Sequence, residues 1–571
     1  MRLVPWVKAR EKLIAPLLLA AAAVAWVAAV VWHVLAAGLP LWSMDAVRSV
    51  YEFGLGGKPG QPPEAGLLAL AGYLGKGGAA LAALYAYFKV LDLSADRIWL
   101  RFFYRNHVVI VGLGEKANRL ALSLRQAGER VAVIELNESH DAVSVLRAAG
   151  AAVLPGDGRS WDVLRQASLQ HADALVCLTS SDATNLRVAL AAREGCARRR
   201  RRSPLRCFVH VADRGLRQIA SEAPHYRHRD GRFEGRVLDV VDVAARVLLT
   251  EWAPDRVASL HAENSQRLHV LVVGADALAR AIVVNLALQA HYARPHRPVV
   301  TLMDPQASQA LVQLTAEYPA LSHLLELRAQ DVSLTHLSPD RLSERTGATA
   351  DASGIDLPSP VLAFVTLERE IDALAAGLHL TRQTRGWTHP PQVVVCMPPH
   401  AEVMATVGVD DAEHALGFAT FDRYSVCSGA YLLGDGLDQD ARRRHEAYLA
   451  DLQAAGQPLR TKPTQFPWDE LDEMVKASNR RQVEHEPVKR RAIEQLGASD
   501  RTVELLARAE HRRWMADLLM AGWSFGPKYD WALRRHHNLV AYDELDEATR
   551  EFDRAVVRRL MVPKTDPSAP A

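Results

Sequence analysis

The sequence predicts a membrane α-hairpin, then an α/β body, then a mainly α-helical C-terminal segment. Three observations lead to this fold class. Two long apolar runs lie in the first hundred residues, two strand–glycine–helix patterns begin near residues 107 and 269, and a helix-rich pattern repeats itself after residue 438. The 571 residues suffice for about three or four domains, because a domain takes about 150 residues.

Composition narrows the class of protein. The formal net charge is +2, which gives no global bias toward nucleic acid, so no nucleic-acid partner is expected. Hydrophobic residues make up 49% of the chain, and the long apolar runs among them lie in the first hundred positions. The five cysteines show neither CxxC nor Cys/His ligand spacing, so we expect reduced thiols and no metal site.

Residues 1–105 are predicted to form a two-helix transmembrane hairpin. Residues 13–37 are a run of 25 residues with one histidine and no formal charge, longer than the about 20 that cross a bilayer. This length, without a small-residue cleavage site, disfavours a cleaved signal peptide. Residues 66–93 form a second apolar run. Basic residues flank both outer ends, which predicts a multi-pass protein of a cell (inner or plasma) membrane, with both termini cytoplasmic and lipid as a partner.

The loop between the two runs leaves the role of the hairpin open. It contains FGLGG but no TVGYG, the sequence whose carbonyl groups form a potassium selectivity filter. Lys76, near the start of the second run, either faces a polar cavity or extends to the headgroups. Potassium selectivity by the known filter is therefore not predicted.

Residues 106–262 are predicted to form a Rossmann domain. A short apolar strand runs into a GxGxxA loop and a helix, and the next strand ends in Glu135, 21 residues past Gly114. Gly112 allows the tight turn, Gly114 lets a pyrophosphate approach the backbone, and Ala117 lets helix and strand pack closely. The helix N-terminus faces the phosphates, and Glu135 can bind ribose hydroxyls. The alternative is a Rossmann turn that binds nothing.

The segment from about 107 to 250 resembles the N-terminal domain of regulators of potassium conductance (RCK). The features that carry the resemblance besides the glycine loop are Glu135, Gly156, Asp157, Thr179, Asp182 and Asn185. The resemblance implies that NAD or another adenine nucleotide binds as a regulatory ligand. It places Asp157 near the adenosine and Thr179 near the ligand. The candidate cofactor-binding residues are thus Gly112, Gly114, Ala117, Glu135, Asp157, Thr179 and Asp182.

Residues 263–430 are predicted to form a second, degenerate Rossmann domain. Gly274 survives in its loop, with Asp276 and Leu278 around it, and Asp304 ends its second strand. Close approach of a pyrophosphate is disfavoured because only one glycine remains. We interpret this domain as mainly structural, paired with the first as RCK domains are. A retained ligand site at Gly274 and Asp304 is the alternative.

Residues 506–561 resemble the repeat domain of ryanodine receptors. The residues that carry this resemblance are Glu510, His511, Trp514, Gly522, Trp523, Gly526, Asn538, Leu539, Val540, Tyr542 and Leu545. An internal echo lies upstream, where His445 aligns with His511 and Trp468 aligns with Tyr542. Residues 438–561 are therefore predicted to be a divergent repeat pair.

The clear repeat copy holds candidate binding residues. Trp514, Trp523 and Tyr542 can stack on a base, with Lys528 and Arg534 near its phosphates. The alternative is that the aromatic residues form a small core and the basic residues lie in solvent. The segment contains no DxDxDG loop, so calcium binding is not predicted.

The sequence favours a membrane-embedded, nucleotide-sensing protein, an oligomeric ligand-gated ion channel or channel-like effector. Two helices per chain cannot enclose a pore, so this function requires a homo-oligomer, a dimer or a tetramer. One alternative is a membrane-anchored sensor or a signalling or defence effector that acts through a partner. The sequence offers no identifiable catalytic acid or base beside Gly114, so the chain is not expected to be an enzyme.

Overall fold

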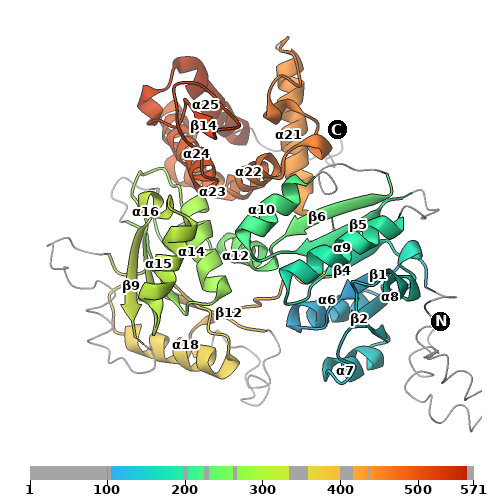
Figure 1. Ribbon diagram of the computed structural model, residues 1–571. Coiled ribbons are helices and arrows are strands. Elements are labelled where there is room, and N and C mark those ends of the chain that lie inside the picture. Colours follow the sequence, from blue (N-terminus) through green and yellow to red (C-terminus); the bar gives the residue numbers. More distant parts are fainter. Residues whose placement is uncertain are drawn as a thin grey trace, which may run out of the picture. The chain divides into compact units, whose positions relative to one another are not determined.

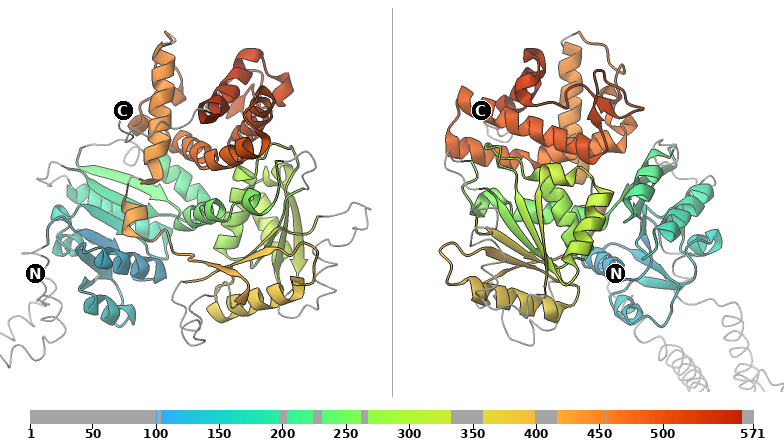
Figure 2. Two further views of the ribbon diagram at one scale, coloured as in Figure 1. Left: turned by 180° about the vertical axis from the view of Figure 1, so that it is seen from behind. Right: turned by 60° about the vertical axis from the view of Figure 1, so that its left-hand side comes forward.

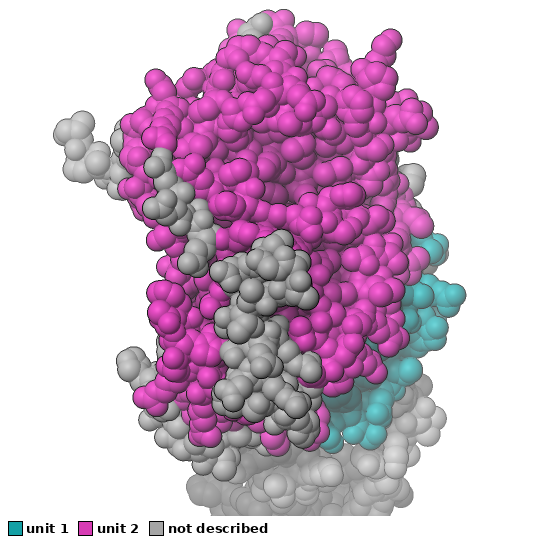
Figure 3. Space-filling model, turned by 90° about the vertical axis from the view of Figure 1, so that its left-hand side faces the viewer, with its two compact units in different colours: residues 1–208, 231–233 teal, residues 209–230, 234–571 magenta. Residues whose placement is uncertain are grey.

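The computed structural model describes residues 100, 104–196, 203–223, 231–261, 267–332, 358–398, 416–434, 436–454 and 456–561. These residues divide into two compact units, coloured separately in Figure 3. Unit 1 is drawn from residues 1–208 and 231–233, and unit 2 from residues 209–230 and 234–571. The predicted domain ranges remain predictions.

The predicted membrane location is wrong for the part of the chain that the structure describes. Within those ranges, no helix is both long enough and apolar enough to cross a bilayer. The longest described helix, α24 (Asp500–Met520), has 21 residues but carries Glu510, Arg513 and Asp517 in its C-terminal half, and charged groups are costly in hydrocarbon. The two spans that the sequence predicts, residues 13–37 and 66–93, lie outside the described residues.

The first sheet has six strands in the order β3-β2-β1-β4-β5-β6 (Figure 1). The strands are β1 (Val108–Val111), β2 (Val131–Glu135), β3 (Ala152–Pro155), β4 (Ala174–Cys177), β5 (Leu205–His210) and β6 (Phe233–Leu238). The helices between them are α6 (Glu115–Gln126), α7 (Ala142–Ala148), α8 (Trp161–Gln166), α9 (Asp182–Cys196) and α10 (Arg214–Glu222), with the 3-10 turn η1 (Leu169–His171). Strand β1 pairs in parallel with both β2 and β4.

The apolar runs of the sequence explain this sheet. Every residue of β1 is buried, as expected for a parallel strand covered on both faces. On α6 the buried residues Ala117, Leu120, Ala121 and Leu124 recur at the three- and four-residue spacing of one helix face. The predicted Rossmann-like fold is confirmed for this domain.

The second sheet repeats the topology of the first, in the order β12-β11-β10-β7-β8-β9. Its strands are β7 (His269–Val273), β8 (Val299–Asp304), β9 (Glu326–Asp331), β10 (Leu362–Val365), β11 (Gln392–Cys396) and β12 (Ala419–Phe421). Its helices are α14 (Ala277–Gln289), α15 (Ala307–Glu317), α16 (Leu321–Leu324) and α18 (Glu370–Thr384), preceded by α12 (Val240–Glu251) and α13 (Pro254–Val257). Strand β7 therefore corresponds to β1, and β10 corresponds to β4.

The C-terminal segment is mainly helical, as predicted (Figure 2). Its helices are α21 (Gly436–Ala454), α22 (Glu473–Glu484), α23 (Glu486–Leu496), α24 and α25 (Glu547–Met561). The short elements are η3 (Gly429–Leu433), η4 (Pro463–Gln465), η5 (Trp468–Glu470), η6 (Tyr542–Glu544), β13 (Ser524–Phe525) and β14 (Arg535–His536). Helix α21 packs on α22, and α24 packs on α25.

Within unit 2, the C-terminal helices pack on the second Rossmann domain. Ala293, which follows α14, joins a buried apolar cluster with Ala492, Val503, Leu506 and Val557. Beside this cluster, Arg491 of α23 donates two hydrogen bonds, of 2.7 and 2.8 Å, to the fully buried carboxylate of Asp255 in α13. Apolar burial and a bidentate ion pair together hold these helices against the Rossmann domain.

Candidate functional site

The loop after β1 requires a glycine at its first position. Gly112 has a φ of +98°, a conformation that other residues rarely adopt. Its backbone N–H donates to the carbonyl oxygen of Ile134 at 2.9 Å. A Cβ atom here would lie 3.1 Å from the carbonyl oxygen of Leu178 and from Cα of Thr179. The loop thus lies directly against the end of β4.

Gly114 leaves open space at the N-terminus of α6. It is the N-cap residue of that helix, with φ −65° and ψ 175°, and no side chain caps the helix there. A Cβ atom at Gly114 would meet nothing within 4 Å. The first backbone N–H groups of a helix have no partner within the helix and carry its positive dipole end, so this is a place that suits an anion.

Ala117 and Glu135 complete the predicted loop. Ala117 is fully buried between α6 and the sheet, which agrees with its predicted packing role. Glu135 ends β2, and its Oε1 accepts a hydrogen bond from the backbone N–H of Asn137 at 2.8 Å. This bond fixes the carboxylate at the carboxyl edge of the sheet, where ligands of open α/β sheets bind.

The loop after β4 is held by a buried asparagine. Asn185, on α9, is fully buried. Its Oδ1 accepts hydrogen bonds from the backbone N–H of Thr179 at 2.9 Å and from its hydroxyl at 2.7 Å, and its Nδ2 donates to the Thr179 carbonyl at 3.1 Å. Asp182 is the first residue of α9. Because β1 and β4 are neighbours, Thr179 and the glycine loop share the point where the strand order reverses.

Asp157 follows β3, on the other side of β2. The preceding Gly156 has a φ of +155° and donates its N–H to the Glu135 carbonyl at 2.9 Å. Both Asp157 oxygens accept hydrogen bonds from the Arg159 guanidinium, at 2.7 to 3.0 Å. These bonds lower the pKa of Asp157. Sequence reasoning did not single out Arg159, whose only signal was its spacing of two residues from Asp157.

The predicted first-domain residues thus lie along one edge of the sheet. A side chain at Gly112 would press on Thr179, and one at Gly114, at the start of the next helix, would meet open space. Glu135 and Asp157 extend this edge over β2 and β3. Their roles in binding stay predictions.

The second domain has the same turn but a different helix N-terminus. Gly274 has a φ of +112° and donates its N–H to the Met303 carbonyl at 2.9 Å, as Gly112 does to Ile134. Asp276 then caps α14, because its Oδ1 accepts the Ala279 N–H at 2.9 Å. Its φ of −68° and ψ of 178° nearly equal those of Gly114, so the two loops differ here mainly in the side chain.

Asp276 is paired with a partly buried arginine. The Arg423 guanidinium donates to Oδ2 of Asp276 at 2.5 Å, and the two side chains are 13% and 7% exposed. Arg423 also donates to the carbonyl oxygens of Thr366 and Leu367 after β10, at 3.4 and 3.3 Å. The carboxylate therefore takes the place that a phosphate would need, which disfavours a retained ligand site here.

Asp304, the other candidate of the second domain, has a local role. Its Oδ1 accepts the backbone N–H of Gln306 at 2.9 Å.

Arg423 was missed by sequence reasoning, since it lies 147 residues from its partner Asp276 and no motif connects the two.

The two aligned repeat segments make the same contacts. His445 Nε2 lies 2.7 Å from the Phe466 carbonyl oxygen, and His511 Nε2 lies 2.9 Å from that of Val540. Both histidine rings also approach the aromatic residue two positions past that carbonyl group, Trp468 at 6.1 Å and Tyr542 at 5.9 Å between ring centroids. Three ion pairs of the first copy each have an equivalent in the second. Arg442–Asp469 corresponds to Arg508–Asp543, Arg480–Asp438 corresponds to Arg554–Glu504, and Arg480–Glu473 corresponds to Arg554–Glu547.

The aromatic candidates of the clear copy belong to the core of the pair. Trp523 is 4% exposed, and its Nε1 lies 3.4 Å from the sulfur of Met474 in the first copy. Trp531 packs on the first-copy cluster that contains Trp468. Trp514 contacts the rings of His511 and His536, with centroids 5.5 and 4.9 Å away.

The remaining candidates do not converge on one point. Tyr542 is buried beneath the guanidinium groups of Arg508 and Arg550, 4.9 and 5.7 Å from its ring centroid. Arg534 donates to the Ala521 carbonyl at 2.8 Å, and Lys528 is exposed. The structure therefore favours the core interpretation over a base-stacking site.

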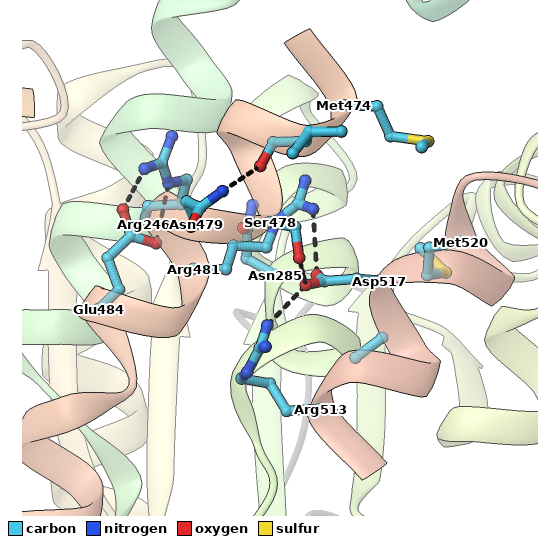
Figure 4. Close-up of polar contacts among 12 residues, drawn as sticks. Arg246, Asn285, Met474, Ser478, Asn479, Arg481, Glu484, Arg513, Asp517 and Met520 are labelled. Atoms are coloured by element: carbon cyan, nitrogen blue, oxygen red, sulfur yellow. Dashed lines mark hydrogen bonds and ion pairs between the residues drawn. The ribbon is translucent and has the colours of Figure 1, made fainter. Parts of the chain in front are cut away.

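A buried charge network joins the two copies (Figure 4). Asp517 of α24 accepts hydrogen bonds from Ser478 at 2.9 Å, from Arg481 at 3.1 Å and from Arg513 at 2.6 Å. Arg513 also contacts Glu510, and both side chains are 2% exposed. These contacts fix α22 against α24, so the repeat pair is one packed body.

The fold and the loops define a tandem Rossmann protein with one open and one self-capped helix N-terminus, followed by a helical repeat pair. Comparison with known families agrees. Residues 108–207 match the TrkA-N domain, and residues 485–562 match the RyR domain. These matches confirm the predicted likeness to the RCK nucleotide-binding type of domain and to the ryanodine receptor repeat.

Two curated relatives share only part of the chain. The Trk system potassium uptake protein TrkA of Streptomyces coelicolor is 36% identical over 91 residues, which are 15% of this chain and 39% of that protein. The TrkA homolog of Pyrococcus abyssi is 25% identical over 142 residues, 25% of this chain and 58% of that protein. The chain thus matches less than two thirds of the length of either.

Solved structures of the GsuK channel are similar to most of this chain. The alignment with one of them covers 75% of this chain and 98% of the channel chain, with 16% identity and a TM-score of 0.40. Others are of that channel bound to NAD (15% identity, TM-score 0.39, 78% and 86% coverage) and bound to ADP (17%, 0.38, 75% and 98%). At these values the likeness is too distant to support a function.

Proposed function

We propose that the chain is a nucleotide-sensing regulatory protein that binds an adenine nucleotide at the first Rossmann domain. The observation that carries the proposal is the open N-terminus of α6. A Cβ atom at Gly114, the N-cap residue of α6, would meet nothing within 4 Å, and the preceding turn has a positive φ at Gly112 that only glycine adopts without strain.

The residues present fit such a ligand. The N–H groups of α6 would hold the pyrophosphate, and Glu135 at the end of β2 would accept hydrogen bonds from ribose hydroxyls. Asp157 and Arg159 lie beyond β2, on the side of the sheet where an adenosine would extend. Thr179, after β4, lies beside Gly112 of the glycine loop, on the side away from Glu135. The bound nucleotide would supply no chemistry beyond its charge and shape, because the role proposed is regulation and not catalysis.

The second domain supports the assignment by contrast. It has the same strand order, the same positive-φ glycine and nearly the same backbone at the helix N-terminus. There the space is taken by Asp276, whose charge is paired with Arg423. One nucleotide per chain is therefore expected, at the first domain.

The proposed output is control of ion transport through a partner protein. Support comes from the likeness of residues 108–207 to the TrkA-N domain and to two Trk potassium uptake proteins. A pore within this chain is not proposed, because the residues on which it was predicted lie outside the described ones. A homo-oligomer remains a prediction from the sequence.

Isothermal titration calorimetry tests the nucleotide site. NAD and ADP are the first ligands to try, with ATP as a third. Saturable binding to the full chain supports the proposal, and absence of binding of all three nucleotides contradicts it.

A further inference from the structure

Arg214 joins the C-terminal ends of two helices that lie far apart in the sequence. It is the first residue of α10, the helix between β5 and β6 of the first sheet. One of its terminal nitrogens donates to the carbonyl oxygen of Glu317 at 2.7 Å, and the other donates to that of Met520. Glu317 is the last residue of α15, and Met520 is the last residue of α24. All of these residues belong to unit 2.

The contact suits the chemistry of a guanidinium group. The last carbonyl groups of a helix have no partner within it and carry the negative end of the dipole, so a cation there is stabilising. The planar group also lies 4.3 Å from the ring centroid of Tyr318, which adds a cation–π contact. A lysine would bring the charge, but it has no rigid fork to reach two carbonyl groups and stack at once.

Neighbouring contacts hold the three elements in place around Arg214. Asp213 caps α10, accepting the Leu216 N–H at 2.7 Å. Arg280 of α14 pairs with the side chain of Glu317 at 2.9 Å. Arg534 donates to the carbonyl of Ala521, one residue beyond the carbonyl that Arg214 contacts. The end of α24 is thus tied to α10 on one side and to the loop between β13 and β14 on the other.

We propose that Arg214 is a positioning residue that couples α10 to the second Rossmann domain and to the repeat pair. A shift of α10 would move the ends of α15 and α24 together, because one guanidinium group holds both. The mechanical part of this inference stands without a ligand. Its use in signalling rests on the proposed nucleotide binding at the first domain.

Hydrogen–deuterium exchange of the full chain tests the mechanical part. The variants are Arg214→Ala, Arg214→Lys and, as a matched control, Arg369→Ala, which removes a 76% exposed arginine. The amides to follow are those of Tyr318 and Ala521, which close the last turns of α15 and α24. In Arg214→Ala both should exchange about tenfold faster, the effect of losing a hydrogen bond to a charged group.

The comparison of variants separates coupling from a local effect. Arg214→Lys should restore protection at one helix end at most, and Arg369→Ala should change neither. Unchanged exchange at both ends in Arg214→Ala overturns the proposal, as does full rescue of both ends by lysine. Exchange that rises throughout unit 2 would mark general destabilisation and would also overturn it.

A second measurement tests the signalling part. In the wild-type chain, saturating ADP should change exchange at Ala521, and in Arg214→Ala this change should disappear while ADP affinity stays within about twofold. Loss of affinity in the variant, or an undiminished response at Ala521, contradicts the coupling. If the wild type binds none of the nucleotides, the proposed function fails, but the ligand-free exchange result still decides the mechanical role.

Discussion

Asp276 and Arg423 form a partly buried ion pair at the N-terminus of α14, with 2.5 Å between the interacting atoms. At the same position of the first Rossmann domain, Gly114 leaves open space. The two domains share strand order and loop backbone, so this one position separates a helix end that is open to a ligand from one that the chain itself has capped.

Gly114→Asp should abolish nucleotide binding without unfolding the first domain. A side chain at Gly114 meets no atom within 4 Å, and its φ of −65° is open to any residue. The new carboxylate would cap α6 as Asp276 caps α14, and it would repel phosphate. Calorimetry should show affinity for ADP weakened at least about a hundredfold, which corresponds to about 2.7 kcal/mol.

Gly386→Asp is the matched control for this variant. A Cβ atom at Gly386 would also meet nothing within 4 Å, and this glycine lies in the second domain. The control should bind ADP as the wild type does. Unchanged affinity in Gly114→Asp, with the control behaving normally, would remove the site assignment.

Arg423→Ala should destabilise the second Rossmann domain by about 3 kcal/mol, because it leaves the Asp276 carboxylate buried without its cation. The urea midpoint of unit 2 reports the loss. The double variant Asp276→Asn/Arg423→Met should recover most of it, since an uncharged cap needs no counterion. A single variant as stable as the wild type would show that the pair does not hold this loop.

Asn185→Ala should cost about 1–3 kcal/mol, because it removes the buried side chain that pairs with the N–H and carbonyl groups of Thr179. It should also weaken ADP binding, since the loop beside Gly112 loses its support. Thr179→Val removes the hydroxyl contacts with Asn185 and Ser181 but keeps both backbone hydrogen bonds of Thr179 to Asn185, so its effect on both measurements should be smaller. The reverse order in urea unfolding and calorimetry would refute the role given to Asn185.

Acid should destabilise both Rossmann domains through equivalent histidines. His107 and His269 each stand five residues before the positive-φ turn glycine of their domain, and burial lowers the pKa of each to about 4 from an ordinary 6.5. The unfolded chain therefore takes up the proton first. The free energy of unfolding keeps its full value above pH 6.5. It falls between pH 6.5 and pH 4, by up to about 1.4 kcal/mol per pH unit for each histidine.

The variants His107→Gln and His269→Gln measure this slope domain by domain. Each should flatten the dependence of the urea midpoint on pH between 6.5 and about 4 in its own domain. A slope that is the same in the variants and the wild type would mean that other groups control the acid response.

The backbone of the candidate site was predictable, but its long-range partners were not. Local patterns determine the strand, the turn at Gly112 and the helix after Gly114, because turn geometry and helix packing depend on adjacent residues. Arg423, in contrast, meets Asp276 across 147 residues, and only the fold brings them together. The contacts of Arg214 could not be predicted from the sequence either, because its partners are backbone carbonyl groups that have no sequence signature.

The repeat pair shows a second limit. The aligned residues His445 and His511 could be matched by sequence, and their contacts are the same. Whether Trp523 binds a ligand or fills a core depends on what lies across from it, and that surface comes from the other copy.

The most direct test of the account is the stoichiometry of ADP and NAD binding to the wild-type chain, measured by isothermal titration calorimetry. The open end of α6 and the self-capped end of α14 predict one nucleotide per chain. No binding of either nucleotide would contradict the proposed site, and two equivalents per chain would contradict the role given to Asp276.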